Sequence, residues 1–287
     1  MDKVNFGEYA TYYRYLKNDE CPLIVLHGGP GSTHNYFEVL DPLYDKGHSI
    51  LMYDQLGCGE SYVDHHPELW KPETWIEELD NLIKSLKIKK FHLLGQSWGG
   101  MLALLYALDK GQDNILSLIL SSTLPSSALW AKEQHRLISF MSEEDIKAIK
   151  EAEENNDFSS PAYQLANEHF MKLHCADIED SDPICVRREK KVGHESYLYA
   201  WGENEFHPSG TLKDFDVIDR LKDIKVPTLI ISGTNDLCTP LIAKTMFDGI
   251  KDSRWELFDG CRHMCYVEDT KHYLNLIDEW LKEHNHE

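Results

Sequence analysis

The chain has 287 residues, of which 42% are hydrophobic and 27% charged, as expected for a soluble globular protein with a full core and room for an insertion. Its formal charge is −20, from 29 Lys and Arg against 49 Asp and Glu, which argues against nucleic acid and anionic membranes as partners. The 7 cysteines include no C-x-x-C pair, and the 15 histidines show no metal-binding spacing. No apolar run resembles a signal peptide or a membrane span. We therefore expect a cytoplasmic protein with free thiols, no catalytic metal and no cofactor.

The first part of the chain alternates predicted strands with predicted helices. We expect a hairpin over residues 4–14, strands over 22–27 and 49–54, helical structure over 36–46, a helix from 72 to about 86, and strands over 91–96 and 115–121 that flank a further helix. Pro72 and the acidic residue after it are typical of a helix start. Alternation of this kind predicts a mostly parallel, doubly wound sheet.

The alternation stops between residues 124 and 221, which show helical patterns and loops but no convincing buried strand. It resumes with a strand over 227–232, a helix over 241–250, a strand over 254–258 and a helix near 269–284. We therefore expect an α/β core made of residues 1–123 and 222–287, with residues 124–221 inserted as a helical cap. Open α/β sheets bind ligands at the carboxyl ends of their strands, so the cap should cover that edge.

A serine lies at the apex of a predicted strand–turn–helix, in the run Gly-Gln-Ser-Trp-Gly-Gly over residues 95–100. In such a G-x-S-x-G elbow the glycines leave room for a cramped backbone, and the turn presents the hydroxyl at the top of the sheet. Ser97 is therefore a candidate nucleophile. The same motif also occurs as a tight turn with an inert serine, so the other parts of a catalytic site must be found.

A glycine-rich loop follows an earlier strand, in the run His-Gly-Gly-Pro-Gly over residues 27–31. The negative charge of a tetrahedral intermediate needs preorganised N–H donors, each worth about 2.7–4 kcal/mol of barrier. We expect one donor to be the amide of Trp98, the residue after the nucleophile, and the other to be the amide of Gly29, with Gly28 as the alternative. A glycine-rich turn without a ligand is the competing interpretation.

An acid and a histidine follow in the chain order that this architecture requires. Asp236 comes after the strand predicted over 227–232, and His263 after the strand over 254–258, so both should lie at the sheet edge that carries Ser97. His263 would accept the Ser97 proton, and Asp236 would hold the imidazole in the right tautomer. A further glycine-containing run, over residues 54–61, should support the elbow by packing and take no part in the chemistry.

Together these runs resemble the prolyl iminopeptidase group of α/β-hydrolases, which are aminopeptidases of the serine type. The likeness spans the whole chain, and the pairing of the 27–31 run with Gln-Ser-Trp-Gly-Gly is fairly specific for the group. The resemblance implies that Glu205 binds the free α-amino group of the substrate, with Glu203 adding charge beside it. Some members of the group place a second acid directly after the triad aspartate. This chain has Leu237 there, so amine recognition would rest on Glu205 alone or on another acid of the cap.

Three functional hypotheses follow. The leading one is a serine aminopeptidase that releases the N-terminal residue, proline favoured, from short peptides through an acyl-enzyme on Ser97. An amino-acid amidase or small-ester hydrolase with the same triad is the close alternative, because serine acylation accepts amides and esters alike. A ligand-binding protein without catalysis is a remote alternative, since such a protein should lack a triad or oxyanion residue and none is missing. The expected partners are short peptides or amino-acid amides with a free N-terminus.

Overall fold

The computed structural model describes residues 1–285, and these contain an eight-stranded sheet with the order β1-β2-β4-β3-β5-β6-β7-β8. The β1–β2 and β2–β4 pairs are antiparallel, and the other pairs are parallel. The mostly parallel sheet that the sequence predicts is therefore confirmed. The strands are β1 (Asp2–Phe6), β2 (Tyr9–Leu16), β3 (Leu23–Leu26), β4 (Ile50–Asp54), β5 (Phe91–Gln96), β6 (Ile115–Ser121), β7 (Thr228–Gly233) and β8 (Ser253–Phe258).

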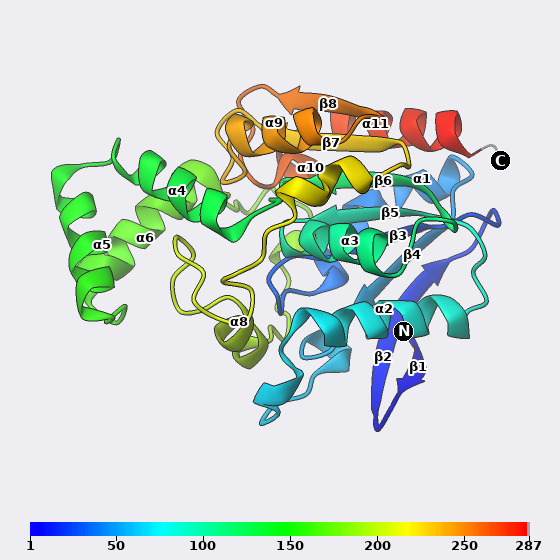
Figure 1. The fold of residues 1–287 in the computed structure, drawn as a ribbon, viewed down its shortest axis with the longest axis horizontal. Helices are drawn as coiled ribbons and strands as arrows, with labels where there is room; N and C mark the ends of the chain where they lie inside the picture. The colour runs from blue at the N-terminus through cyan, green and yellow to red at the C-terminus, as the bar shows by residue number, and fades with distance from the viewer. Residues whose placement is uncertain (286–287) are drawn as a thin grey trace.

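Two hydrophobic cores lie on the two faces of the sheet, because successive side chains of a buried strand point to opposite faces. In β3, Leu23 and Val25 belong to one core, and Ile24 and Leu26 to the other. Figure 1 shows helices on both sides of the sheet. The core of Leu26 is covered by α2 (Pro72–Ser85), α3 (Trp98–Asp109) and α9 (Pro240–Gly249). The core of Leu23 is covered by the 3₁₀ helix η1 (His34–Leu40), α1 (Pro42–Asp45) and α11 (Thr270–His284).

Two details differ from the predicted elements. The segment expected to be helical over 36–46 is divided into η1 and α1, and α1 begins at Pro42. Proline lacks a backbone N–H, so it cannot continue the hydrogen bonds of a preceding helix but fits the first turn of a new one. The short helix α10 (Cys265–Glu268) has no counterpart among the predicted elements, because four residues are too few to show a helical period.

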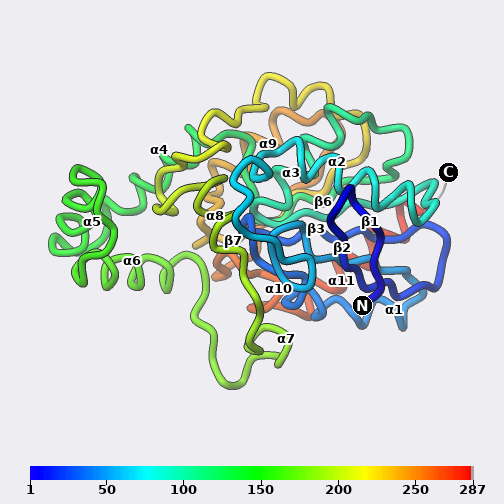
Figure 2. Tube along the Cα trace, turned by 90° about the horizontal axis from the view of Figure 1, so that it is seen from below, coloured from blue at the N-terminus to red at the C-terminus, as the bar shows by residue number. Residues whose placement is uncertain are grey.

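The segment between β6 and β7 contains helices α4 to α8. Three of them have a serine as the N-cap residue, namely Ser126, Ser142 and Ser160. The side chain of each serine accepts a hydrogen bond from the backbone N–H three residues later. Figures 1 and 2 show α5 and α6 projecting together beyond one end of the sheet, whereas the chain around α7 returns toward the core. The helices of this segment are α4 (Ser127–Ile138), α5 (Glu143–Asn155), α6 (Pro161–His174), α7 (Ile184–Arg187) and α8 (His194–Ala200).

Besides η1, the described chain contains the 3₁₀ helices η2 (Gly59–Ser61), η3 (Pro67–Leu69) and η4 (Ile218–Asp223).

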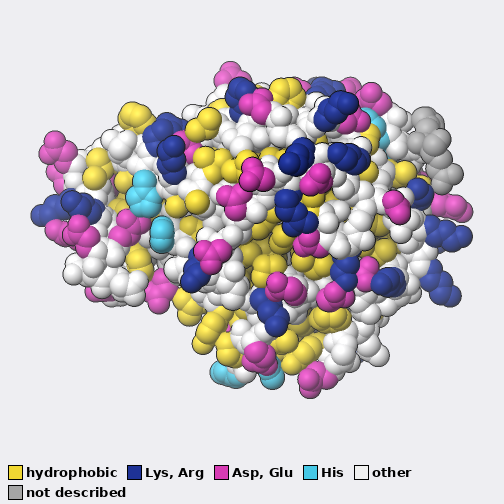
Figure 3. Space-filling view, viewed as in Figure 1, with side chains coloured by type: hydrophobic (Ala, Val, Ile, Leu, Met, Phe, Trp, Pro, Cys, Tyr) yellow, Lys and Arg dark blue, Asp and Glu magenta, His cyan; other side chains and the backbone are white. Residues whose placement is uncertain are grey.

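Acidic and basic side chains are interspersed on the face of the molecule that Figure 3 shows. The acidic excess is therefore not gathered into one patch on this face. None of the helices within residues 1–285 has the length and apolar character that crossing a bilayer requires.

Candidate active site

Ser97 lies in a sharp turn between β5 and α3, as the sequence predicts. Its backbone has φ 55° and ψ −125°, a conformation that residues with a side chain rarely adopt. Two glycines make room for this turn. A Cβ at Gly95 would lie 2.2 Å from the Gly99 carbonyl oxygen, and a Cβ at Gly99 would lie 2.1 Å from the Leu26 carbonyl oxygen. The turn places the partly exposed Ser97 in the wall of a cavity of about 260 Å³.

Asp236 and His263 meet beyond the carboxyl ends of β7 and β8. Both are buried, His263 Nδ1 lies 2.7 Å from Asp236 Oδ1, and His263 lines the same cavity as Ser97. The Asp236 carboxylate accepts three further hydrogen bonds, from the Ser122 hydroxyl (2.6 Å) and from the backbone N–H groups of Gly233 (3.2 Å) and Cys238 (2.8 Å). Because a carboxylate faces Nδ1, that nitrogen carries the proton and Nε2 keeps its lone pair. Ser97 and His263 thus line one cavity, and Asp236 lies behind His263, bound to its Nδ1.

The helical segment also contacts His263. The His263 backbone N–H donates to the His174 carbonyl oxygen at 3.1 Å, and His174 Nδ1 lies 2.9 Å from the Asn235 carbonyl oxygen. The Trp130 ring meets the His263 ring edge-on, with centroids 6.2 Å apart, and its indole N–H donates to the Glu205 carbonyl oxygen at 3.0 Å. Residues of α4 and α6 therefore help to position the imidazole.

The loop after β3 presents the candidate oxyanion donors. Gly28 and Gly29 both line the cavity, and Gly29 has φ +115°, where a Cβ would collide with the backbone of the loop. The Gly28 amide is already engaged, since it donates to the Tyr36 hydroxyl at 2.6 Å. The Trp98 amide lies in the first turn of α3, where N–H groups have no partner within the helix. This geometry favours Gly29 and Trp98 over Gly28.

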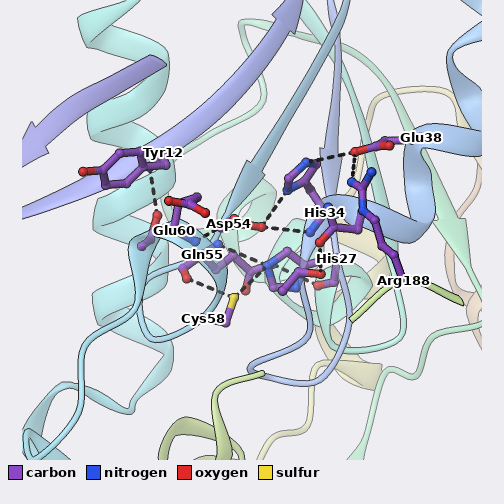
Figure 4. Close-up of polar contacts among 12 residues, drawn as sticks. Tyr12, His27, His34, Glu38, Asp54, Gln55, Cys58, Glu60 and Arg188 are labelled. Carbon is purple, nitrogen blue, oxygen red and sulfur yellow. Dashed lines mark hydrogen bonds and ion pairs between the residues drawn. The ribbon is translucent and has the colours of Figure 1, made fainter. Parts of the chain in front are cut away.

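A buried hydrogen-bond network joins the loop after β3 to the elbow, and Figure 4 shows its members His27, Gln55 and Cys58. Gln55 Nε2 donates to the His27 carbonyl oxygen at 2.9 Å, while Gln55 Oε1 accepts from the Trp98 indole N–H at 2.8 Å. The Gln55 backbone N–H donates to His27 Nε2 at 3.1 Å, so the ring proton is on Nδ1, which faces the Gly28 carbonyl oxygen. Burial lowers the pKa of His27 to about 4, which keeps the ring neutral. These contacts confirm that the 54–61 segment packs against the elbow.

Within residues 1–285, His27, Asp54 and Cys58 form a cluster of side-chain types that can ligate metals. Their donor atoms are engaged in hydrogen bonds. Asp54 Oδ1 lies 2.7 Å from His34 Nδ1, and the Cys58 thiol donates to the Gln55 carbonyl oxygen at 3.2 Å. Burial raises the pKa of Cys58 well above its usual value, which disfavours the thiolate that a metal needs. The cluster fits the network better than it fits an ion.

The two glutamates singled out in the sequence lie in different places. Glu205 lines the cavity of Ser97 and His263, and its carboxylate accepts a hydrogen bond from the Tyr197 hydroxyl. Burial raises the pKa of Glu205, and the Tyr197 bond and the charge of His263 oppose that rise. Glu203 is exposed and lines neighbouring grooves outside this cavity. Among the described residues of the cavity wall, Glu205 is the only acidic side chain.

Most of the remaining cavity wall carries no sequence signal. Leu237, which follows Asp236, is buried and lines the cavity. Lys190 adds a cation to the wall, which the sequence does not predict. The apolar and aromatic members are Tyr36, Met171, Cys175, Tyr197, Leu237, Met264 and Tyr266.

A mostly parallel sheet with a serine elbow and a His–Asp pair at its carboxyl edge is characteristic of the α/β hydrolases, and the alpha/beta hydrolase fold family matches residues 22–270. The chain is 54% identical to a proline iminopeptidase of Lactobacillus helveticus, over 99% of this chain and 98% of the relative. It is 52% identical to a proline iminopeptidase of Clostridioides difficile, over 96% of each. The chain therefore belongs to the proline iminopeptidase family of α/β hydrolases, as the resemblance of its motifs predicts.

Solved structures agree with this assignment. The proline iminopeptidase of Mycobacterium smegmatis has a TM-score of 0.87 and 31% identity, covering 99% of this chain and 98% of that chain. The structure of VinJ has a TM-score of 0.90 and 30% identity over the same shares. The likeness thus includes the helical segment as well as the sheet.

Proposed function

We propose that this protein is a serine aminopeptidase that releases the N-terminal residue, proline above others, from short peptides through an acyl-enzyme on Ser97. One observation carries the proposal: a single small cavity contains the elbow serine, a histidine paired with a buried aspartate, and the carboxylate of Glu205. Family membership supports it, since the relatives at 52% and 54% identity are named proline iminopeptidase.

The cavity supplies the groups that acyl transfer needs. Ser97 Oγ attacks the carbonyl carbon of the first peptide bond while His263 Nε2 accepts the hydroxyl proton, and Asp236 stabilises the resulting imidazolium. The N–H groups of Gly29 and Trp98 bind the developing oxyanion, each lowering the barrier by about 2.7–4 kcal/mol. His263 then protonates the leaving amine. A water molecule, deprotonated by His263, then attacks the acyl-enzyme ester. His263 returns the proton to Ser97 Oγ as the acid product leaves.

Glu205 gives the site its preference for a free amine. Its carboxylate forms a charge-assisted hydrogen bond with the α-ammonium group and so aligns the first carbonyl with Ser97. The Tyr197 hydroxyl holds this carboxylate, and the Trp130 indole holds its backbone. Because burial raises the pKa of Glu205, the ionised form that binds the amine is lost at a higher pH than for an ordinary glutamate.

The small apolar cavity suits proline as the first residue. A volume of about 260 Å³ is at the lower end of the range for ligand sites. With Leu237 in the position of a possible second acid, amine recognition in this chain rests on Glu205. Apolar wall atoms from Leu237, Met171 and Met264 would contact the pyrrolidine ring.

We also propose that residues 124–221 act as a cap between the core parts 1–123 and 222–287. This segment supplies Met171, Tyr197 and Glu205 to the cavity, and the His174 carbonyl contacts the backbone of the proposed base. The cap therefore selects the substrate while the core performs the chemistry.

A cytosolic location fits the cysteines of the chain. Cys58 and Cys238 are buried free thiols close to the site, and thiols of this kind persist in reducing compartments.

The proposal is tested with the 4-nitroanilides of proline, alanine and leucine and with their N-acetylated counterparts. We expect turnover of the free amines, with prolyl-4-nitroanilide the best substrate, and loss of turnover on acetylation. Ser97→Ala should abolish turnover and labelling by a fluorophosphonate probe. Equal rates for free and acetylated substrates would contradict the aminopeptidase, and faster hydrolysis of prolinamide or of 4-nitrophenyl acetate than of prolyl peptides would favour an amidase or an esterase.

Glu205→Gln isolates amine recognition. Loss of a charge-assisted hydrogen bond should lower kcat/KM for prolyl-4-nitroanilide by about 10–100-fold, with 4-nitrophenyl acetate hydrolysis little changed. Glu203→Gln is the matched control, because this exposed glutamate lies two residues before Glu205 in the same loop and does not line the cavity, so the substitution should leave both rates unchanged. An unchanged kcat/KM in Glu205→Gln would show that another group binds the amine.

A further inference from the structure

The chain carries a compact basic run that neither the fold nor the proposed chemistry uses. Arg187, Arg188, Lys190 and Lys191 fall within five residues at and after the end of α7, in a chain with a formal charge of −20. Both arginines have protein acceptors, and Figure 4 shows Arg188 engaged with Glu38. The two lysines instead lie over tyrosine rings.

The segment that carries the lysines is fastened to the oxyanion loop. The Gly193 N–H donates to the Gly31 carbonyl oxygen at 2.7 Å, and the Gly59 N–H donates to the Lys191 carbonyl oxygen at 2.7 Å. On the other side, α7 places Cys185 and Val186 in the same core as η1. The backbone at Lys190 is therefore held from both directions.

Lys190 lies in the wall of the Ser97 cavity, with Nζ 5.2 Å from the centroid of the Tyr36 ring. Within residues 1–285, no acceptor receives a hydrogen bond or an ion pair from this ammonium group. Burial lowers the pKa of Lys190, the charge of Arg188 adds to that effect, and Cys185 opposes it. A partly desolvated charge without a partner is unfavourable unless a ligand supplies the opposite charge.

The cavity is therefore polarised. Glu205 is connected to the His263 side, because the Trp130 indole binds its backbone and packs against the imidazole. Lys190 is connected to the oxyanion side through Tyr36, whose hydroxyl accepts from the Gly28 amide. The two charged groups that line the cavity with Ser97 thus have opposite signs and contact different neighbours.

We propose that Lys190 binds the free carboxylate of the residue that follows the scissile bond, so that zwitterionic dipeptides are the preferred substrates. This inference rests on the proposed aminopeptidase function. The charges of a dipeptide are complementary to those of the cavity, with the ammonium group toward Glu205 and the carboxylate toward Lys190. Lys190 also repels an ammonium group, which disfavours the reversed orientation. The small volume of the cavity limits the length of peptide that can reach both charges.

The test compares prolyl-alanine with prolyl-alaninamide, which differ only in the terminal carboxylate, in wild type and in Lys190→Met. Prolyl-4-nitroanilide, which also lacks the carboxylate, reports the chemistry alone. We expect wild type to favour the free acid and Lys190→Met to lose about tenfold in kcat/KM for it, mainly through KM, while the amide and the anilide change by less than about twofold. Lys190→Arg should retain the preference for the acid.

Lys191→Met is the matched control. Its ammonium lies 3.4 Å from the centroid of the Tyr62 ring and does not line the Ser97 cavity, so the preference for the acid should persist. Equal use of acid and amide by wild type, or equal losses on both in Lys190→Met, would overturn the role of Lys190 and leave the aminopeptidase intact. A protein that cleaves none of the three prolyl substrates would overturn both.

Discussion

Glu78 is a buried carboxylate whose ionisation should set the pH dependence of stability. It lies in α2, and both of its oxygens accept from the Leu56 backbone N–H, at 2.9 and 3.0 Å. The Thr11 hydroxyl donates to the same carboxylate at 2.7 Å. Burial is the main cause that raises the pKa of Glu78 from 4.5 to about 7. The segment that it holds, next to Gln55, is the one that supports the elbow.

A raised pKa in the folded state means that the folded protein binds the proton more tightly than the unfolded chain does. The stability that this proton contributes is fully present below pH 4.5 and is lost as the pH rises through 7. Between pH 5 and pH 8.5 the loss amounts to about 2–3 kcal/mol, from roughly 1.4 kcal/mol per pKa unit. Glu78→Gln has no proton to lose, so its stability relative to wild type should rise by that amount over the same interval.

Urea unfolding, followed by tryptophan fluorescence at pH 5 and pH 8.5, measures this difference. Subtracting the free energy of unfolding of wild type from that of Glu78→Gln at each pH cancels the contribution of every other titrating group. Glu77→Gln, in the neighbouring exposed position of the same helix, should show no such pH-dependent difference. If the free energies of unfolding of Glu78→Gln and wild type differed by the same amount at both pH values, the reasoning would be refuted.

Two substitutions and one comparison of pH profiles also test the site. Asp236→Asn should lower kcat on prolyl-4-nitroanilide by about 10³–10⁴-fold, because the amide no longer holds His263 in the tautomer that accepts the serine proton; a loss below tenfold would contradict the triad. Gln55→Leu leaves the Trp98 indole N–H and a backbone carbonyl unpaired, so the free energy of unfolding in urea should fall by about 1–3 kcal/mol for each group, and an unchanged urea midpoint would contradict the network. Burial raises the pKa of Glu205, so protonation of this carboxylate, added to that of the base, should make the acid-side fall of kcat/KM steeper for prolyl-4-nitroanilide than for 4-nitrophenyl acetate, which has no amine; equal slopes for the two substrates would exclude Glu205 as the amine ligand.

The sequence predicts those parts of the site that depend on local pattern. Ser97, Asp236 and His263 each follow a strand of the parallel part of the sheet, and the carboxyl ends of parallel strands meet at one edge. The sequence alone therefore predicts that these three residues lie close together. Glu205 is identified only through the resemblance of its motif, since nothing in the spacing of residues 202–206 indicates where that loop lies.

The rest of the cavity depends on packing between distant segments. Lys190 lines the cavity of Ser97, and the hydrogen bond from the Gly193 N–H to the Gly31 carbonyl oxygen holds its segment there; the pattern of the sequence does not indicate this contact between loops. Gln55 reaches Trp98 through a hydrogen bond between side chains 43 positions apart. Glu203 and Glu205 are both glutamates and stand two positions apart in the sequence. Only the path of the backbone leaves the Glu203 side chain exposed and places the Glu205 side chain in the cavity wall.

The positive φ at Ser97 also has a consequence for how this protein could change over generations. Glycine adopts that conformation more readily than serine does, so Ser97→Gly should melt at the same temperature as Ser97→Ala or above it, while neither variant has a nucleophile. A protein of this fold that no longer needed catalysis would therefore lose no thermal stability by replacing this serine with glycine. The serine at this positive φ therefore has a conformational cost, which the need for a nucleophile explains and the preference of the turn does not.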